Sequence, residues 1–261
     1  MTCYKSLGGL LYFADCLEIL RSLPDGSVDM ILQDPPYNMT NCKWDYAIDL
    51  QTLWQEWKRV CRGVVVMTAA QPFVTDLIMS NRDGFQYDLI WRKSNITGYL
   101  NANKMPLRQH EYILVFGKGT YNPQMWRKET PRAAQRTVDS KGAYGKVEEG
   151  VFRIAPDEMG FPRSVLDFNT AYHDREAGLH PTQKPVDLFR YLIRTYTNEG
   201  ETVFDGYTGS GTTAVACLKE NRKYICCEKE AGYIETANKR IDEATRQGDL
   251  FLAVGCSPEK I

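Results

Sequence analysis

The sequence of 261 residues predicts an α/β protein with a mostly parallel, twisted sheet. Short apolar runs of strand length alternate with stretches whose apolar residues recur at helical spacing. A Gly-rich turn follows one of these runs and opens a helix, as in nucleotide-binding α/β folds. Between residue 117 and about residue 162 the periodicity disappears, which predicts an irregular insertion in the fold.

The elements are expected in a fixed order along the chain. The first half is expected to form helices at 17–23, 49–61 and about 73–80, with strands at 27–32, 64–68, 87–91 and 112–116. The second half is expected to form helices at 185–197, 212–221 and 231–245, with strands at 202–204 and 223–227. The helix at 49–61 is the clearest, because Leu53, Trp54 and Trp57 share one face and Asp49 is a suitable N-cap.

Charge is distributed unevenly along the chain. The formal net charge is −1, which by itself argues against a nucleic-acid partner. Residues 92–146, however, contain eleven Lys and Arg against three Asp and Glu, so the acidic excess lies in the rest of the chain. A local basic excess is typical of a solvated face or of a surface that contacts phosphates.

The eight cysteines predict reduced, buried thiols in a cytoplasmic protein. The apolar stretch 7–14 is too short and too soon followed by acidic residues to be a secretory signal. No CxxC pair occurs and the three histidines are scattered, so no metal site is expected. The longest apolar run, 64–67, is far too short to span a membrane, and no membrane association is expected.

The Gly-rich turn predicts a nucleoside site. It begins at Asp205, directly after the strand expected at 202–204, and contains Gly209 and Gly211; Glu228 directly follows the next expected strand. Glycines let backbone approach a ligand, and an acidic residue at this place can hold ribose hydroxyls. The spacing also fits a dinucleotide fingerprint, which keeps an NAD-dependent oxidoreductase as an alternative. A P-loop is excluded because Thr212 stands where that motif needs Lys.

A second motif, Asp34-Pro35-Pro36-Tyr37, directly follows a buried strand. Two prolines fix φ and remove two backbone donors, so the turn is rigid and its carbonyl groups are free to accept hydrogen bonds. The carboxylate adds another acceptor and the tyrosine a flat face. Such a turn suits an exocyclic amino group on a planar base.

With these motifs in place, the sequence resembles the amino-directed DNA methyltransferases that use S-adenosylmethionine (AdoMet), in the permuted class whose catalytic motif precedes the AdoMet motif. The matching segments occur in the family's order at 15–18, 27–29, 34–37, 111–116, 180–185, 205–213 and 224–228. The resemblance implies a Rossmann-like methyltransferase fold. In it, residues 1–117 form the catalytic half, 118–162 a target-recognition insertion and 163–261 the AdoMet-binding half.

The resemblance also implies the site residues. The catalytic turn is Asp34, Pro35, Pro36 and Tyr37. Contacts to AdoMet are implied for Asp15 and Cys16 near the adenine, Glu228 at the ribose, Thr182 and Lys184 near the methionine end, and Asp205, Tyr207, Gly209, Ser210, Gly211 and Thr212 in the Gly-rich loop. The chain departs from the family at Gly206, where the family usually has Pro, and a less rigid turn is expected there.

The implied reaction is methylation of the N6 amino group of adenine at specific sites in double-stranded DNA. The base is expected to flip out, stack on Tyr37 and donate its amino hydrogens to Asp34 and the Pro35 carbonyl, and the nitrogen then attacks the methyl group in line. Attack on carbon 5 of cytosine is disfavoured, because no Pro-Cys turn is present. N4 of cytosine remains the main alternative, and RNA or protein amide methylation and a non-catalytic DNA-binding protein stay open.

The irregular basic segment is expected to read the DNA sequence. The candidate contacts are Lys118, Trp126, Arg127, Lys128, Arg132 and Arg136. Double-stranded DNA is therefore the expected partner. A homodimer, a cognate restriction endonuclease, and a bacterial or phage origin are kept open.

Overall fold

The computed structural model describes residues 2–6, 8–37, 46–128, 158–170 and 183–253 of the chain. The chain divides into two compact units, one of residues Met1–Asn122 and Ser164–Ile261 and the other of Pro123–Arg163. The predicted site residues Arg132, Arg136 and Thr182 lie outside the described residues.

The large unit contains a nine-stranded sheet in the order β1-β2-β11-β10-β3-β4-β6-β5-β9. Neighbouring strands from β2 to β4 are parallel, while β6 is antiparallel to both β4 and β5, so the sheet is mixed but mostly parallel. This confirms the predicted fold class. The strands are β1 (Thr2–Ser6), β2 (Gly9–Phe13), β3 (Val28–Gln33), β4 (Cys61–Ala69), β5 (Phe85–Thr97), β6 (Arg108–Phe116), β9 (Val165–Phe168), β10 (Thr202–Asp205) and β11 (Lys223–Glu228).

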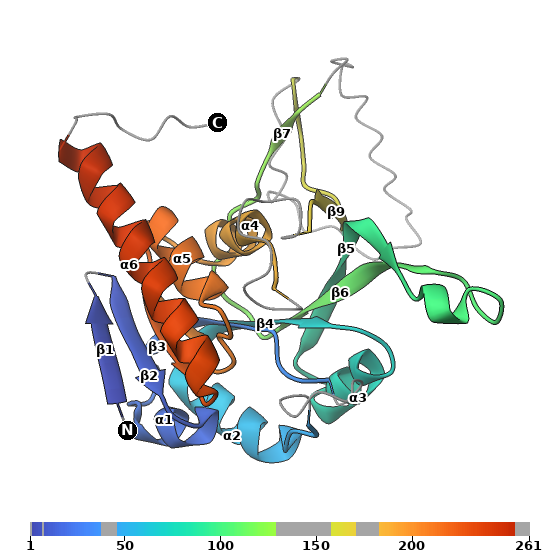
Figure 1. The fold of residues 1–261 in the computed structure, drawn as a ribbon. Coiled ribbons are helices and arrows are strands. Elements are labelled where there is room, and N and C mark those ends of the chain that lie inside the picture. The colour runs from blue at the N-terminus through green and yellow to red at the C-terminus, as the bar shows by residue number, and fades with distance from the viewer. Residues whose placement is uncertain (1, 7, 38–45, 129–157, 171–182, 254–261) are drawn as a thin grey trace, which may run out of the picture. The chain divides into compact units, whose positions relative to one another are not determined.

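Helices pack on both faces of the sheet (Figure 1). One face is covered by α1 (Cys16–Ser22), α2 (Leu50–Val60) and α3 (Phe73–Ser80). The other is covered by α4 (Val186–Tyr196), α5 (Thr212–Lys219) and α6 (Ala231–Ala253). The predicted N-cap of α2 is confirmed, because the Asp49 carboxylate accepts the Thr52 backbone N–H at 3.1 Å.

The predicted strands at 87–91 and 112–116 are much longer in the structure. β5 and β6 continue as a hairpin that projects from the sheet (Figure 1), with a short 3₁₀ turn, Tyr99–Asn101, near its tip. The residues of the projecting part show no regular alternation of polar and apolar side chains. They are strands because the two segments pair with each other, and the sequence pattern alone could not predict this. The strands β1, β2 and β9 were also not predicted, because they are short and largely exposed or half-buried.

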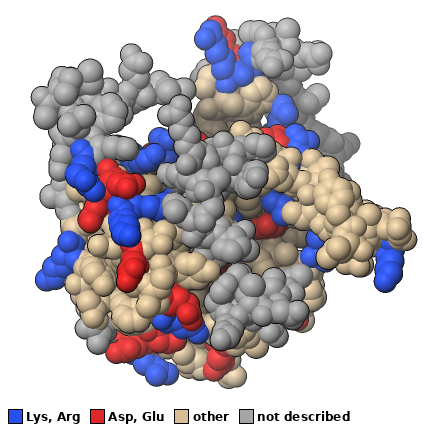
Figure 2. Space-filling model, in the orientation of Figure 1, with Lys and Arg blue, Asp and Glu red and all other residues tan. Residues whose placement is uncertain are grey.

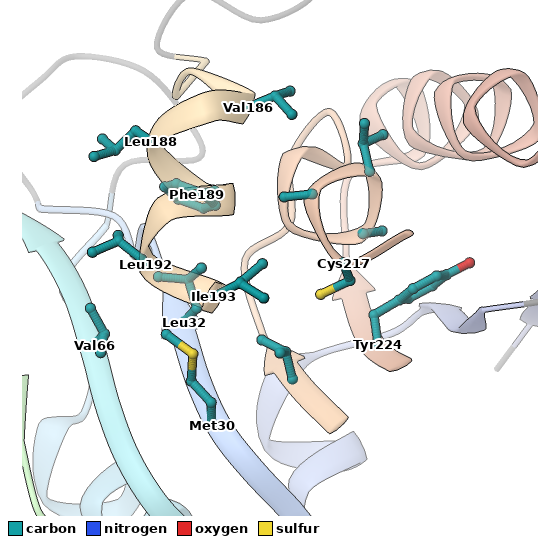
Figure 3. Packing of buried hydrophobic residues seen from close by; sticks show 14 of the residues in the cluster. Met30, Leu32, Val66, Val186, Leu188, Phe189, Leu192, Ile193, Cys217 and Tyr224 are labelled. Carbon is teal, nitrogen blue, oxygen red and sulfur yellow. The ribbon is translucent and has the colours of Figure 1, made fainter. Parts of the chain in front are cut away.

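Helix α4 packs on the sheet through a buried apolar face. Leu188, Phe189 and Leu192 of α4 belong to one buried cluster with Met30, Leu32 and Val66 of the neighbouring strands (Figure 3), and all three are at most 2% exposed. Burial of side chains of this size contributes roughly 2 kcal/mol each to stability. Helix α4 is thereby held on the sheet, and with it Lys184, two residues before its first turn.

The small unit contains the antiparallel pair β7 (Trp126–Arg127) and β8 (Met159–Gly160). Trp126 packs within this unit: its indole N–H donates to the Phe161 carbonyl at 2.8 Å and the Arg163 guanidinium lies 4.5 Å from its ring centre. A Cβ at Gly160 would meet the same ring at 2.4 Å, so glycine is required for this contact. Trp126 therefore has a packing role, and its contact with DNA stays a prediction.

No helix among the described residues is long and apolar enough to cross a membrane. Lys and Arg are interspersed with Asp and Glu on the face of the molecule seen in Figure 2. The described cysteines are all free; Cys16, Cys217, Cys226 and Cys227 are buried as predicted, whereas Cys3 is exposed.

The packing of α4 generates a stability prediction. Leu192→Ala removes a side chain that is 0% exposed, and we expect the free energy of unfolding to fall by about 2–5 kcal/mol through lost burial and the cavity left behind. Met79→Ala on α3 is the control, because Met79 is 68% exposed and its loss is expected to cost no more than about 0.5 kcal/mol. Urea denaturation of both variants measures the difference; similar costs would contradict the packing described for α4.

Candidate active site

The two predicted motifs meet at one edge of the sheet. β3 and β10 are parallel neighbours, with Val203 opposite Met30 and Phe204 opposite Ile31. Asp34 directly follows β3, and the Gly-rich loop directly follows β10 at Asp205. Because the carboxyl ends of parallel strands lie at the same edge, the two loops form one site, as is usual for ligands of open α/β sheets.

The Asp34 carboxylate accepts three hydrogen bonds. Its Oδ1 accepts the Tyr37 hydroxyl at 2.6 Å and the Thr68 hydroxyl at 2.5 Å, and its Oδ2 accepts the Lys184 ammonium at 2.6 Å. The donors come from the turn itself, from β4 and from the residues before α4. A carboxylate has about four lone-pair positions. Asp34 is thus fixed in orientation and retains room for one further donor.

Lys184 connects the two loops. It is 7% exposed, its ammonium lies 2.6 Å from Asp34 Oδ2 and 3.4 Å from Glu111 Oε2, and its carbonyl accepts the Thr212 hydroxyl at 3.4 Å. Burial alone lowers the pKa of Lys184, but the carboxylates of Asp34 and Glu111 outweigh burial and raise it. Lys184 therefore stays charged between them.

Glu111 and Lys93 extend this group of charges along the sheet. The Lys93 ammonium lies 3.1 Å from Glu111 Oε1, and the two side chains are only 12% and 17% exposed. Burial alone raises the pKa of Glu111, but the ammonium groups of Lys184 and Lys93 outweigh burial and lower it. Sequence reasoning did not identify Glu111, Lys93 or Thr68 as site residues.

Tyr37 is held more firmly than the sequence suggested. One face of its ring stacks on Phe73 of α3, with 5.3 Å between ring centres and 22° between ring planes. The Lys184 ammonium lies 5.9 Å from the ring centre. Burial raises the pKa of Tyr37 well above its ordinary value and the Asp34 carboxylate adds to the rise, so the hydroxyl stays protonated and donates. Only the face opposite Phe73 could take a stacked base.

Asp205 organises the Gly-rich loop. Its carboxylate accepts the Tyr207 backbone N–H at 2.9 Å and the Thr213 hydroxyl, so it ties the loop to the first turn of α5. Burial raises the pKa of Asp205 to about 7. Gly211 has φ of 85° and packs against Ala237 of α6, so no other residue suits this position.

Buried Arg240 of α6 stabilises the same loop through hydrogen bonds. Its guanidinium donates to the Ser210 carbonyl at 2.7 Å and to the Ser210 hydroxyl at 3.0 Å. It also lies 3.4 Å from the Thr212 hydroxyl. Ser210 and Thr212 are thus engaged with the protein at 3% and 5% exposure. This arginine was not predicted from the sequence.

Glu228 ends β11 beside the loop. Its Oε2 accepts the Gly209 N–H at 2.9 Å, and its Oε1 accepts the N–H groups of Lys229 and Glu230, each at 2.9 Å. Burial raises the pKa of Glu228, and the hydrogen bonds from these backbone donors, which lower the pKa, offset only part of the rise. With three donors bound, the carboxylate can accept one more, such as a hydroxyl group.

Gly206 is required by close packing. A Cβ at this position would lie 2.2 Å from the Cys16 Sγ and 3.3 Å from the Gln33 Nε2. Its φ is not positive, so the reason is space and not conformational freedom. The Gln33 amide, 0% exposed, finds no hydrogen-bond partner among the described residues. The structure thus explains the departure at position 206 by the neighbouring Cys16.

The remaining predicted residues have varied surroundings. Asp15 is the exposed N-cap of α1 and accepts the Leu17 N–H at 2.9 Å. Lys118 is exposed, and Arg127 is exposed and lies 3.4 Å from Glu158. Whether Lys118, Arg127 or Lys128 contacts DNA stays a prediction.

Comparisons with known proteins give a family. A model of the N6/N4 methyltransferase family, described as DNA methylase, matches residues 28–239. The chain is 26% identical over 250 residues to the type II methyltransferase M.HpaI of Haemophilus parainfluenzae, covering 89% of this chain and 74% of that protein. It is 24% identical over 278 residues to M.HinfI of Haemophilus influenzae, covering 95% of this chain and 72% of that protein.

Solved structures support the fold. The complex of M1.HpyAVI with SAM superposes with a TM-score of 0.60 at 24% identity, covering 89% of this chain and 98% of that chain. The cytosine-N4-specific PvuII DNA methyltransferase superposes with a TM-score of 0.65 at 17% identity, covering 96% of this chain and 94% of that chain. The α/β architecture of this chain is therefore that of known DNA methyltransferases.

The buried Asp205 generates a pH prediction. Between its ordinary value of 3.8 and its raised pKa of about 7, folded Asp205 keeps a proton that the unfolded chain has lost. The free energy of unfolding should therefore fall as pH rises through this window, by up to about 1.4 kcal/mol per pH unit from this group. Asp205→Asn cannot titrate, so we expect it to lose less stability between pH 4 and 7 than the wild type in urea denaturation. Parallel profiles would contradict this.

Proposed function

Because this chain belongs to the N6/N4 family of DNA methylases, we propose that it transfers the methyl group of AdoMet to the N6 amino group of adenine in double-stranded DNA. The observation that carries the proposal is Lys184, which contacts the Asp34 carboxylate with its ammonium and the Thr212 hydroxyl with its carbonyl. A single residue thereby links the turn suited to an amino group with the loop suited to a nucleoside.

The residues of the Gly-rich loop, with Glu228 beside it, fit AdoMet. Glu228 has one free acceptor position for a ribose hydroxyl, and the turn Gly209–Gly211 brings backbone close to a ligand at the start of α5. We propose further contacts from Asp15, Cys16, Thr182, Lys184 and Tyr207. When bound there, AdoMet supplies a methyl group activated by the sulfonium. The solved M1.HpyAVI structure with SAM supports this assignment by its fold.

Asp34 has the chemistry needed to activate an amino group. The lone pair of an exocyclic nitrogen is delocalised into the base, so the nitrogen is a poor nucleophile. A hydrogen bond from the amino group to the remaining acceptor position of Asp34, and another to the Pro35 carbonyl, would favour a more tetrahedral nitrogen with a localised lone pair. The nitrogen–carbon bond would form as the sulfur–carbon bond breaks, so that the sulfur leaves as a neutral thioether, and the positively charged nitrogen would then give one proton to Asp34 or to water.

Tyr37 supplies the surface for the extruded base. Its hydroxyl is anchored on Asp34 and its ring is backed by Phe73, so the ring cannot rotate away when a base stacks on the opposite face. Stacking on an aromatic ring contributes about 1–3 kcal/mol per base, which offsets part of the cost of unpairing. The basic segment 118–146 is the part that we propose to contact the DNA.

Replacement of Asp34 tests the catalytic assignment. We expect Asp34→Ala to lower the rate of tritiated-methyl transfer from AdoMet to DNA by about 100-fold or more, because the amino group loses its charged acceptor. The dissociation constant for AdoMet, measured by calorimetry, should change little, since the Gly-rich loop is untouched. Near-normal turnover of this variant would contradict the assignment of Asp34 as a catalytic residue.

The methylated nucleoside distinguishes the two amino targets. Methylated DNA is digested to nucleosides and the modified one is identified by mass spectrometry. We expect N6-methyladenine, because aspartate at the first position of the turn is the form more usual for adenine enzymes. N4-methylcytosine would instead establish the alternative, which the fold shared with the PvuII enzyme keeps open.

A further inference from the structure

Four charged side chains form a continuous row in which acid and base alternate. The row runs from Asp34 to Lys184, Glu111 and Lys93, with separations of 2.6, 3.4 and 3.1 Å. We propose that Glu111 is a positioning residue for methyl transfer: it holds Lys184 against Asp34 and offsets the positive charge that Lys184 brings to the target amino group. This inference rests on the proposed function.

Strand register places these side chains on one face of the sheet. Thr68 of β4 lies opposite Ile113 of β6, and Glu111 is two residues from Ile113 on the same strand. Glu111 in turn lies opposite Trp91 of β5, and Lys93 is two residues from Trp91. Because side chains alternate between faces, Thr68, Glu111 and Lys93 point to the same side. This is the side covered by α4, which Lys184 precedes.

The charge balance at the reacting nitrogen gives Glu111 its role. During transfer, positive charge moves from the sulfonium to the amino nitrogen, so a carboxylate beside that nitrogen lowers the barrier. The Lys184 ammonium orients Asp34, yet at 2.6 Å it also cancels much of the negative potential of Asp34. Glu111 on the other side of Lys184 restores negative potential. Lys184 can therefore orient Asp34 at a smaller electrostatic cost.

Stability is a weak reason for such a row. Bringing charged groups into a site where they are 7–22% exposed removes hydration, and buried ion pairs often repay no more than that loss. Glu111 Oε2 has no hydrogen-bond partner among the described residues and forms an ion pair with the Lys184 ammonium at 3.4 Å. Glu111 thus places one carboxylate oxygen beside the Lys184 ammonium, while Lys93 holds the other oxygen.

A charge-removing substitution tests the proposal. We expect Glu111→Gln, which keeps the shape of the side chain, to lower kcat by about 10- to 100-fold. The dissociation constant for AdoMet and the KM for DNA should change much less than kcat, because Glu111 acts on the site only through Lys184 and most of the proposed AdoMet contacts are untouched. Asp167→Asn is the matched control. It breaks the ion pair of Arg92, the neighbour of Lys93 on β5, but that pair is exposed, so kcat should not change.

A double-variant cycle separates positioning from a general loss of structure. If Glu111 acts through Lys184, adding Glu111→Gln to Lys184→Met should lower kcat by less than about three-fold. Losses that multiply in the double variant, or a Glu111→Gln kcat within two-fold of wild type, would overturn the inference. If the inference is overturned while the wild type is active and Asp34→Ala is inactive in the same assay, only the role of Glu111 has failed. A wild type that cannot methylate DNA would instead show that the proposed function has failed.

Discussion

The site depends on the parallel pairing of β3 with β10. This pairing brings the loop after each strand to the same edge of the sheet, although the loops are some 170 residues apart in the chain. One loop offers Asp34 and a rigid, carbonyl-rich turn, and the other offers a Gly-rich turn braced by Asp205 and Arg240. Two chemically different half-sites thus become one without any segment having to reach across the molecule.

Electrostatics then couples the two halves. Lys184 is the cation that both share, and its charge is balanced by Asp34 and Glu111 in surroundings that water reaches poorly. Desolvation makes each of these groups sensitive to the others, because charges interact more strongly where the effective dielectric constant is low. The Asp34 carboxylate, which we propose to face the target amino group, is therefore tuned by residues from three other strands and from the segment before α4.

Local patterns in the sequence predicted what is local. The Asp34 turn, the Gly-rich loop, the α2 N-cap and most helices follow from residues close together in the chain, and the structure places them as expected. Glu111 and Lys93 could not be found in this way, because their proximity to Lys184 arises from strand register and from helix packing. One signal was available: both lie at alternating positions from apolar core residues, where a charge is unusual. The stacking of Tyr37 on Phe73 is likewise a tertiary contact.

The central claim is tested most directly by a structure of the protein with sinefungin, an unreactive AdoMet analogue, and an unmethylated DNA duplex that contains the sequence the protein methylates. We predict an extruded adenine whose amino nitrogen lies about 3 Å from an oxygen of Asp34 and from the Pro35 carbonyl, with Lys184 still between Asp34 and Glu111. An extruded base whose amino group lies beyond hydrogen-bond distance of Asp34 would contradict the account.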